Sequence, residues 1–240
     1  MDKNISLVIG IDEAGRGPLI GDMVIGFVII DENNLEKLKN LGVRDSKLLT
    51  PEERSNLIKD IIKLSKLSIV SYVSPLQIDH ENLNKILLDR IYDVLLSIKS
   101  LLNNWTVKRI TIDMIRGYEK YIVRLRDIFP NTKILFKEKA ERSFIEVAAA
   151  SILAKYYRDT NIHGLKPLFG DYGSGYPTDN KVRQWIKRLY SRTKEPPPIV
   201  RRTWGMLKEI APEWYVEKKA LISKKKKRVI KSILDFIGKK

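Results

Sequence analysis

The chain has 240 residues, 43% of them hydrophobic and 31% charged, which predicts a globular protein with one sizeable core and an appendage. It contains no cysteine, and its apolar runs are far shorter than the roughly 20 residues of a membrane-spanning helix; we therefore expect no disulfide, no thiolate zinc site, no membrane segment and a cytoplasmic location. The formal net charge of +16 favours a polyanionic partner, most simply nucleic acid bound through its phosphates.

The first strong pattern is a short apolar run, residues 7–11, that ends on Asp12 and Glu13. The run predicts a buried strand. Successive strand residues point to opposite faces, so the two carboxylates can serve one site only if the chain leaves the sheet at Glu13. The glycines of Gly15-Arg16-Gly17 permit that departure. A polar hairpin turn is the simpler interpretation of an Asp-Glu-x-Gly string.

Further along the chain, predicted strands and helices alternate. Apolar and β-branched runs predict strands at residues 23–30, 67–73, 107–112 and 133–136. Helical spacing predicts helices at residues 51–64, 82–102, 118–128 and 143–162, and capping boxes are expected at Thr50, Ser74 and Ser143. A hairpin followed by α/β crossovers predicts an α/β fold with a mixed sheet and helices on its faces.

The basic character belongs to the C-terminal part of the chain. Residues 1–180 contain 26 Lys and Arg against 24 Asp and Glu, whereas residues 181–240 contain 19 against 5. Residues 164–179, with four glycines and two prolines, predict an irregular loop before this part. We therefore divide the chain into a core, residues 1–178, and a basic helical appendage, residues 179–240. For residues 224–228 alone, a solvated surface tail is an equally good interpretation.

Four carboxylates stand out by position: Asp12 and Glu13 after the first strand, Asp113 after the fourth, and Asp159 on the last core helix. Sites in open α/β sheets lie beyond strand ends, so Asp12 and Asp113 become neighbours if their strands are adjacent and parallel. Clustered carboxylates resist ionising together and require a compensating cation. Because the oxygen donors are accompanied by no cysteine, Mg²⁺ or Mn²⁺ is favoured over zinc.

Simpler roles remain open for several of these positions. His80 and His163, the two histidines of the chain, fit surface or helix-cap positions better than metal ligands. Asp159 can pair with Lys155, four residues earlier in the same predicted helix. Tyr176 can be an aromatic plug beneath its glycine-rich loop.

Residues 12–17, Asp-Glu-Ala-Gly-Arg-Gly, resemble the N-terminal signature of type 2 ribonucleases H, the ribonuclease HII family. Similar motifs follow in order, including residues 148–159, which are similar to the family's alanine-rich helix ending in Arg-Asp, and residues 201–204, which resemble a segment of archaeal members. The resemblance implies a ribonuclease H-like mixed sheet flanked by helices, with a C-terminal helical appendage.

The resemblance also implies the chemistry. Asp12, Glu13, Asp113 and Asp159 would bind two divalent metal ions, one activating a water for in-line attack on a phosphodiester and the other stabilising the leaving 3′-oxygen. The expected substrates are RNA/DNA hybrids, cleaved in the RNA strand, and duplex DNA with embedded ribonucleotides, nicked on their 5′ side. The products would carry a 3′-hydroxyl and a 5′-phosphate.

Substrate contacts follow from the same family motifs. Gly15, Arg16 and Gly17 would sense the ribose 2′-hydroxyl and engage a phosphate, because glycines let backbone groups approach the sugar closely. Tyr176 would pack on the deoxyribose that follows the ribonucleotide. Phosphate and backbone contacts are expected from Ser46 and Lys47 in an Asp-Ser-Lys motif, and from Arg201 and Arg202.

The chain departs from the family in one region. The family usually has Lys-Ala-Asp before the alanine-rich helix, whereas this chain has Lys139-Ala140-Glu141, and Phe144-Ile145 replaces a common Tyr-Pro. A monomer is expected from the resemblance alone. A replication clamp is a partner to test, because residues 230–240 are either a clamp-binding peptide or a docked amphipathic helix, and the helix is the favoured interpretation.

Two other functions compete with this hypothesis. A non-catalytic nucleic-acid-binding protein that uses the basic appendage would keep its function when Asp113 is replaced by asparagine. A DNA nuclease of the same superfamily would cut all-DNA duplexes, and the Gly-Arg-Gly and Tyr176 features would then have no purpose.

Overall fold

The computed structural model describes residues 5–44, 49–102 and 104–218. In chain order its elements are β1 (Ser6–Ala14), β2 (Met23–Asp31), η1 (Glu32–Asn34), α1 (Leu35–Asn40), α2 (Pro51–Leu64), β3 (Ser65–Val73), α3 (Pro75–His80), α4 (Leu83–Ile98), η3 (Lys99–Leu102), β4 (Thr106–Asp113), α5 (Glu119–Ile128), β5 (Lys133–Lys137), η4 (Ala140–Arg142), α6 (Ile145–Phe169), α7 (Asn180–Tyr190), α8 (Met206–Ile210) and η5 (Pro212–Trp214). All five predicted strands and all four predicted helices are present. None of the described helices is long and apolar enough to cross a membrane.

The predicted helix starts are confirmed at two of three places. Thr50 and Ser74 each form a capping box with the side chain three residues later. At the start of α6 the predicted box is wrong, because the Glu146 carboxylate accepts hydrogen bonds from Arg109 and Thr111 of β4. A buried carboxylate that can pair with a guanidinium from the sheet gains more than it would from a helix cap.

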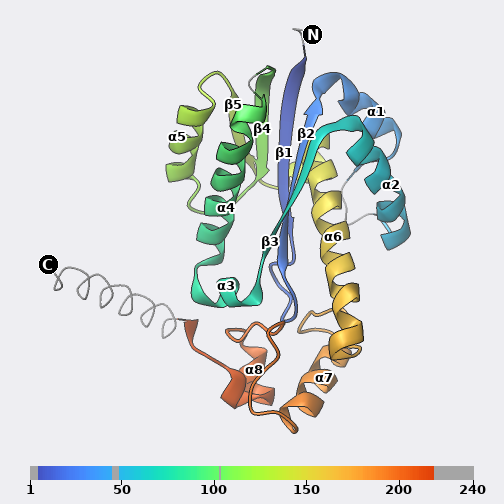
Figure 1. Cartoon of the computed structure of the whole chain (residues 1–240), viewed down its shortest axis with the longest axis vertical. Helices are drawn as coiled ribbons and strands as arrows, with labels where there is room; N and C mark the ends of the chain where they lie inside the picture. The colour runs from blue at the N-terminus through green and yellow to red at the C-terminus, as the bar shows by residue number, and fades with distance from the viewer. Residues whose placement is uncertain (1–4, 45–48, 103, 219–240) are drawn as a thin grey trace, which may run out of the picture. The chain divides into compact units, whose positions relative to one another are not determined.

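Five strands form one mixed sheet in the order β3-β2-β1-β4-β5. β1 is antiparallel to β2 and parallel to β4, and β4 is parallel to β5, so the predicted hairpin and mixed sheet are confirmed. α4 precedes β4 in the chain, and α5 connects β4 to β5. Figure 1 shows these two helices on the other side of the strands from α6.

The chain divides into two compact units. The first contains Met1–Arg16, Met23–Tyr72 and Asn84–Asn161, and therefore the sheet and the first part of α6. The second contains Gly17–Asp22, Val73–Leu83 and Ile162–Lys240, and therefore α3, α7 and α8. The functional division into a catalytic core, 1–178, and a basic appendage, 179–240, stays a prediction.

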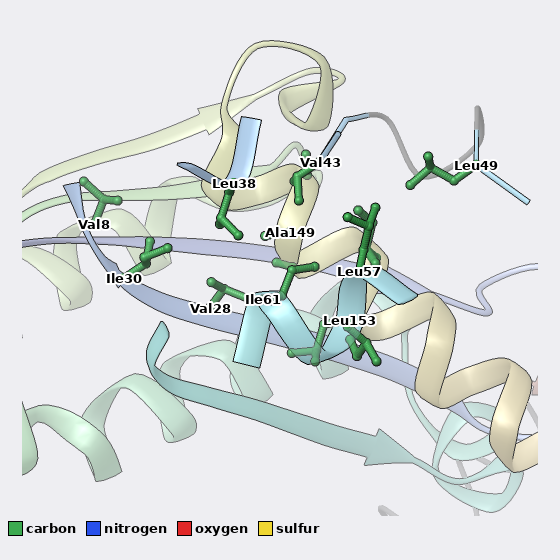
Figure 2. Packing of buried hydrophobic residues seen from close by; sticks show 14 residues of the cluster. Val8, Val28, Ile30, Leu38, Val43, Leu49, Leu57, Ile61, Ala149 and Leu153 are labelled. Atoms are coloured by element: carbon green, nitrogen blue, oxygen red, sulfur yellow. The ribbon is translucent and has the colours of Figure 1, made fainter. Parts of the chain in front are cut away.

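α6 packs on β1 and β2 in the first unit. Figure 2 shows Val8, Val28 and Ile30 of the strands facing α2 and α6, which contribute side chains such as Leu57 and Leu153. The small residues at 148–150 let the helix approach the sheet closely. The alanine-rich stretch is therefore explained by packing as well as by any functional role.

Two glycines mark where the helix backbone approaches the strands most closely. A Cβ atom at Gly10 would lie 2.0 Å from the Glu146 carbonyl oxygen, and one at Gly26 would lie 2.4 Å from that of Ala150. Both distances join the new atom to backbone, which cannot move aside without shifting the helix. These positions of β1 and β2 therefore require glycine.

We expect Gly10→Ala to lower the free energy of unfolding by about 1–3 kcal/mol, the cost of overpacking a filled core. Gly164→Ala is the control, because Gly164 lies in α6, the helix that approaches Gly10, and nothing surrounds its Cβ position within 4 Å. That control should instead raise stability by about 0.4–1 kcal/mol. Urea denaturation of both variants measures the difference, and equal stabilities would contradict the close approach.

The second unit has its own apolar core, built around aromatic residues. Tyr172, Trp185 and Trp214 are buried there with residues of α7 and α8. Each polar aromatic atom has an acceptor: Tyr172 donates to Ile162 O at 2.7 Å, Trp185 to Phe169 O at 2.8 Å and Trp214 to Lys194 O at 3.2 Å. The expected loop over residues 164–179 is correct only after Phe169, because Leu165 and Phe169 pack against this core and extend α6.

Candidate active site

Two acidic side chains lie at the ends of neighbouring parallel strands. The pairing of β1 with β4 ends where Ile11 is aligned with Ile112, so Asp12 and Asp113 are the next residues on adjacent strands. This is the arrangement that the sequence predicted for the case of adjacent, parallel strands. The register confirms that condition.

Glu13 adds a third carboxylate, although not by the predicted route. β1 continues to Ala14 in antiparallel pairing with β2, so the prediction that the chain leaves the sheet at Glu13 is wrong. The strand pairing with β4 ends earlier, at Ile11. The negative charge of Asp113 nevertheless acts on Glu13 and contributes to raising its pKa.

Burial and the negative charges nearby make Asp12 and Glu13 hard to ionise. Burial raises the pKa of Asp12 well above its usual value, the negative charges of Glu13 and Asp113 raise it further, and a hydrogen bond from Ser151 opposes them. Burial likewise raises the pKa of Glu13, against the opposing charge of Arg16. Such a group gains stability when a cation neutralises it.

Asp113 is fixed by the turn that precedes α6. Its Oδ1 accepts a hydrogen bond from the Ala140 amide at 3.0 Å. The residue before that amide, Lys139, has φ 52°, a left-handed conformation that costs a non-glycine residue energy and is often found at functional sites. Glu141 follows directly and is only 6% exposed.

Glu141 is therefore a fourth acid next in sequence to a residue that touches Asp113, and it was missed as a site candidate. A signal for it was present in the sequence. Glu141 occupies the position of the acid in the family's Lys-Ala-Asp motif, and glutamate in place of aspartate keeps a carboxylate there.

Asp159 lies in a different environment. Its Oδ2 is 3.2 Å from Nη2 of Arg54, and its Oδ1 is 2.9 Å from Nη1 of Arg158. Both guanidinium groups are buried, so the Asp159 carboxylate compensates positive charge inside the first unit. Within the described ranges, no three Asp, Glu or His side chains are already arranged as a metal site.

The Gly15-Arg16-Gly17 segment begins with a conformation that only glycine adopts readily. Gly15 has φ 90°. Arg16 Nη1 donates to Glu13 Oε1 at 3.0 Å, and its Nη2 donates to Asn84 Oδ1. The Arg16 side chain is still 38% exposed, so it holds the Glu13 carboxylate while remaining accessible to an anion.

Tyr176 lies in a loop of the second unit that is held by several hydrogen bonds. Its side chain is 39% exposed, which argues against a buried aromatic plug, and a Cβ atom at Gly17 would lie 3.6 Å from its ring. Asp179 accepts hydrogen bonds from the amide and hydroxyl of Ser174, both at 2.8 Å, and these bonds lower the pKa of Asp179. Gly173 has φ 74° and no room for a side chain beside Asp179.

Comparison with known proteins identifies the family. The sequence pattern of Ribonuclease HII matches residues 9–207. The Ribonuclease HII of Sulfurisphaera tokodaii is 42% identical over 215 residues, covering 88% of this chain and 99% of that protein. That of Saccharolobus solfataricus is 40% identical, covering 88% of this chain and 96% of that protein.

The chain belongs to the ribonuclease HII family. The crystal structure of ribonuclease H2 from Pyrococcus horikoshii OT3 agrees with it at a TM-score of 0.77 and 35% identity, over 87% of this chain and 98% of that one. A structure of the PCNA:RNase HII complex from Archaeoglobus fulgidus matches with a TM-score of 0.70 and 32% sequence identity. The match covers 82% of this chain and 95% of that one. The predicted ribonuclease H-like fold is thereby confirmed.

As a member of the ribonuclease HII family, the chain is a metal-dependent ribonuclease that acts on the RNA strand of RNA/DNA hybrids. Its own residues fit a divalent cation. The carboxylates of Asp12, Glu13 and Asp113 supply hard oxygen donors, and a cation would offset the burial and repulsion that raise the pKa values of Asp12 and Glu13.

The remaining residues predicted from the ribonuclease HII motifs differ in burial, and some lie outside the described residues. Arg201 has no exposed surface, and its Nε donates to Gly21 O at 2.9 Å, so it cannot reach a phosphate in this structure. Arg202 Nε donates to Trp214 O at 2.9 Å. Ser46 and Lys47 lie outside the described residues, as does the segment 230–240.

The histidines occupy ordinary helical positions. His80 Nδ1 is 2.8 Å from Leu76 O within α3, as expected for a cap residue. His163 is an exposed residue inside α6 rather than at its end, because the helix continues to Phe169.

Proposed function

We propose that the chain nicks duplex DNA on the 5′ side of embedded ribonucleotides, in addition to hydrolysing the RNA strand of hybrids, and leaves 3′-hydroxyl and 5′-phosphate ends. The observation that carries the proposal is the pair of acids, Asp12 and Asp113, that follows an aligned pair of parallel strands. The negative charge of the third acid, Glu13, acts on Asp12 and raises its pKa. A cation bound beside these carboxylates would favour their charged form.

The metal ligands we propose are Asp12, Glu13 and Asp113, with Glu141 as the fourth. Two Mg²⁺ or Mn²⁺ ions held there would activate the attacking water and neutralise charge on the phosphate and the leaving 3′-oxygen. The Ala140 amide orients Asp113, and Arg16 orients Glu13. Asp159 remains the ligand indicated by the sequence motif, but both of its oxygens contact guanidinium groups, so we assign it to charge compensation.

Substrate recognition is proposed for Gly15, Arg16, Gly17 and Tyr176. The glycine conformation at residue 15 and the exposed guanidinium of Arg16 suit backbone contact with a ribose and contact with a phosphate. The exposed ring of Tyr176 suits stacking on a sugar. Ser46, Lys47 and Arg202 remain proposed phosphate contacts, whereas a direct contact by the fully buried Arg201 is not part of the proposal.

A replication clamp is a proposed partner on the basis of one relative. The solved structure from Archaeoglobus fulgidus is of the PCNA:RNase HII complex, and the matching chain in it is 32% identical to this one. A monomer outside such a complex is also proposed, from the family resemblance.

The test is cleavage of a labelled DNA duplex that contains one ribonucleotide, with Mg²⁺, Mn²⁺ or chelator. We expect metal-dependent nicking immediately 5′ of the ribonucleotide, no cut in the all-DNA duplex, and no product from the Asp113→Asn protein. Binding without nicking under every metal would overturn the proposal in favour of a non-catalytic nucleic-acid-binding protein. Cutting of the all-DNA duplex would favour a DNA nuclease.

A further inference from the structure

The carbonyl group of Gly17 is held by a tryptophan from much later in the chain. Trp204 Nε1 donates a hydrogen bond to Gly17 O at 2.9 Å. Both residues belong to the second unit, although Gly17 directly follows Arg16 of the first. The indole therefore fixes the peptide unit at the end of the Gly15-Arg16-Gly17 segment.

The residues that follow Gly17 are tied to the same unit through their backbone. The amides of Leu19 and Ile20 both donate to Gly175 O, at 2.8 and 3.2 Å. The Gly21 amide donates to Ile199 O at 2.8 Å, and the Arg201 amide donates to Leu19 O at 2.8 Å. The connection between β1 and β2 is thus anchored to the Tyr176 loop and to residues 199–201.

Trp204 is itself held on two sides. The guanidinium carbon of the fully buried Arg201 lies 5.1 Å from the centre of its ring. Asp79, only 3% exposed, accepts hydrogen bonds from the Arg202 amide at 2.8 Å, from the Thr203 amide at 3.0 Å and from the Thr203 hydroxyl at 2.7 Å. A buried carboxylate with three donors in adjacent residues makes this segment rigid.

We propose that Trp204 is a positioning residue for ribonucleotide recognition, and that Asp79 acts through it. The inference rests on the proposed role of Gly17 in sensing the ribose 2′-hydroxyl. Glycine has more backbone freedom than any other residue, so a glycine that must present its backbone groups to a sugar needs external support. The Trp204 indole supplies that support at the Gly17 carbonyl.

The positioning role of Trp204 explains why the two arginines before it bond to the protein backbone. Arg201 and Arg202 were expected to contact the substrate backbone, but Nε of Arg201 donates to Gly21 O and Nε of Arg202 donates to Trp214 O. Their contribution is to hold the segment that carries Trp204. Substrate selectivity would then depend on a residue that touches only protein.

The experiment compares Trp204→Phe with Trp185→Phe. Both changes remove an indole donor from a backbone carbonyl in the second unit, but Trp185 donates to Phe169 O at the end of α6. For Trp204→Phe we expect kcat for nicking at a single ribonucleotide to fall about tenfold, the value of one lost hydrogen bond, with KM and inhibition by the all-DNA duplex changed less than about twofold. Trp185→Phe should keep the parental kcat per folded molecule.

Asp79→Asn is the second variant, because it weakens the support of Trp204 without touching the aromatic ring. It should lower kcat in the same direction, again with little change in the inhibition constant of the all-DNA duplex. Equal kcat values for parent, Trp204→Phe and Asp79→Asn would overturn the inference. If the parent protein does not nick at the ribonucleotide, the proposed function has failed, and the two failures are thus distinguishable.

Discussion

Asp12→Asn is expected to abolish metal-dependent cleavage and, at the same time, to raise the melting temperature of the metal-free protein at neutral pH. Asp12 is 8% exposed and lies beside the negative charges of Glu13 and Asp113. Asparagine keeps the size of the side chain and removes a charge that burial and repulsion make costly. Because loss of even an outer-shell partner costs about 10- to 100-fold in metal sites, loss of this ligand should cost at least about 100-fold in activity.

The expected pH dependence follows from the direction of the pKa shift. The pKa of folded Asp12 is raised above its unfolded value. The resulting stabilisation is fully present below the unfolded pKa and is lost as the pH rises through the folded pKa. In chelator, the difference in melting temperature between the two proteins should therefore be largest at neutral pH and vanish in acid.

Calorimetric melts with and without Mg²⁺ measure both effects. Wild-type protein should be stabilised by Mg²⁺, whereas the Asp12→Asn protein should gain much less, since it lacks a ligand. Asp127→Asn, a change of an exposed acid on α5, is the control and should alter stability by no more than about 0.5 kcal/mol. A lower melting temperature for Asp12→Asn than for wild type in chelator at pH 7 would show that the repulsion is absent.

Local patterns were sufficient to predict the elements that carry Asp12 and Asp113. Alternation and β-branched content located the strands, and two capping boxes located helix starts. To predict that the two acids are neighbours, one must also know that β1 pairs with β4 in parallel. Strand order depends on contacts between residues about a hundred positions apart, which periodicity alone does not reveal.

The predictions that were wrong failed because contacts between residues distant in the sequence override local patterns. α6 continues through Gly164 and Pro167 because Leu165 and Phe169 pack on the core of the second unit, a tertiary effect that overrides local breakers. Glu146 leaves the predicted capping box for Arg109. Arg201 is charged and yet fully buried, which no local pattern in the sequence indicated.

Glu141 and Asp159 are the two candidates for the fourth metal ligand. We expect Glu141→Gln to lower cleavage activity by at least about 100-fold, as for a metal ligand. Asp159→Asn should instead lower the free energy of unfolding by about 2–3 kcal/mol, because it removes the negative charge that two buried guanidinium groups share. Activity per folded molecule of that variant should stay within a few-fold of wild type.

Urea denaturation and Mg²⁺ titration of the nicking rate separate the two roles. For Glu141→Gln the Mg²⁺ concentration at half-maximal rate should rise, because a ligand is weaker as an amide than as a carboxylate; for Asp159→Asn it should not move. The reverse pattern, with a metal defect confined to Asp159→Asn, would return Asp159 to the metal site. Glu141 would then be a packing residue of the turn that holds Asp113 through the Ala140 amide.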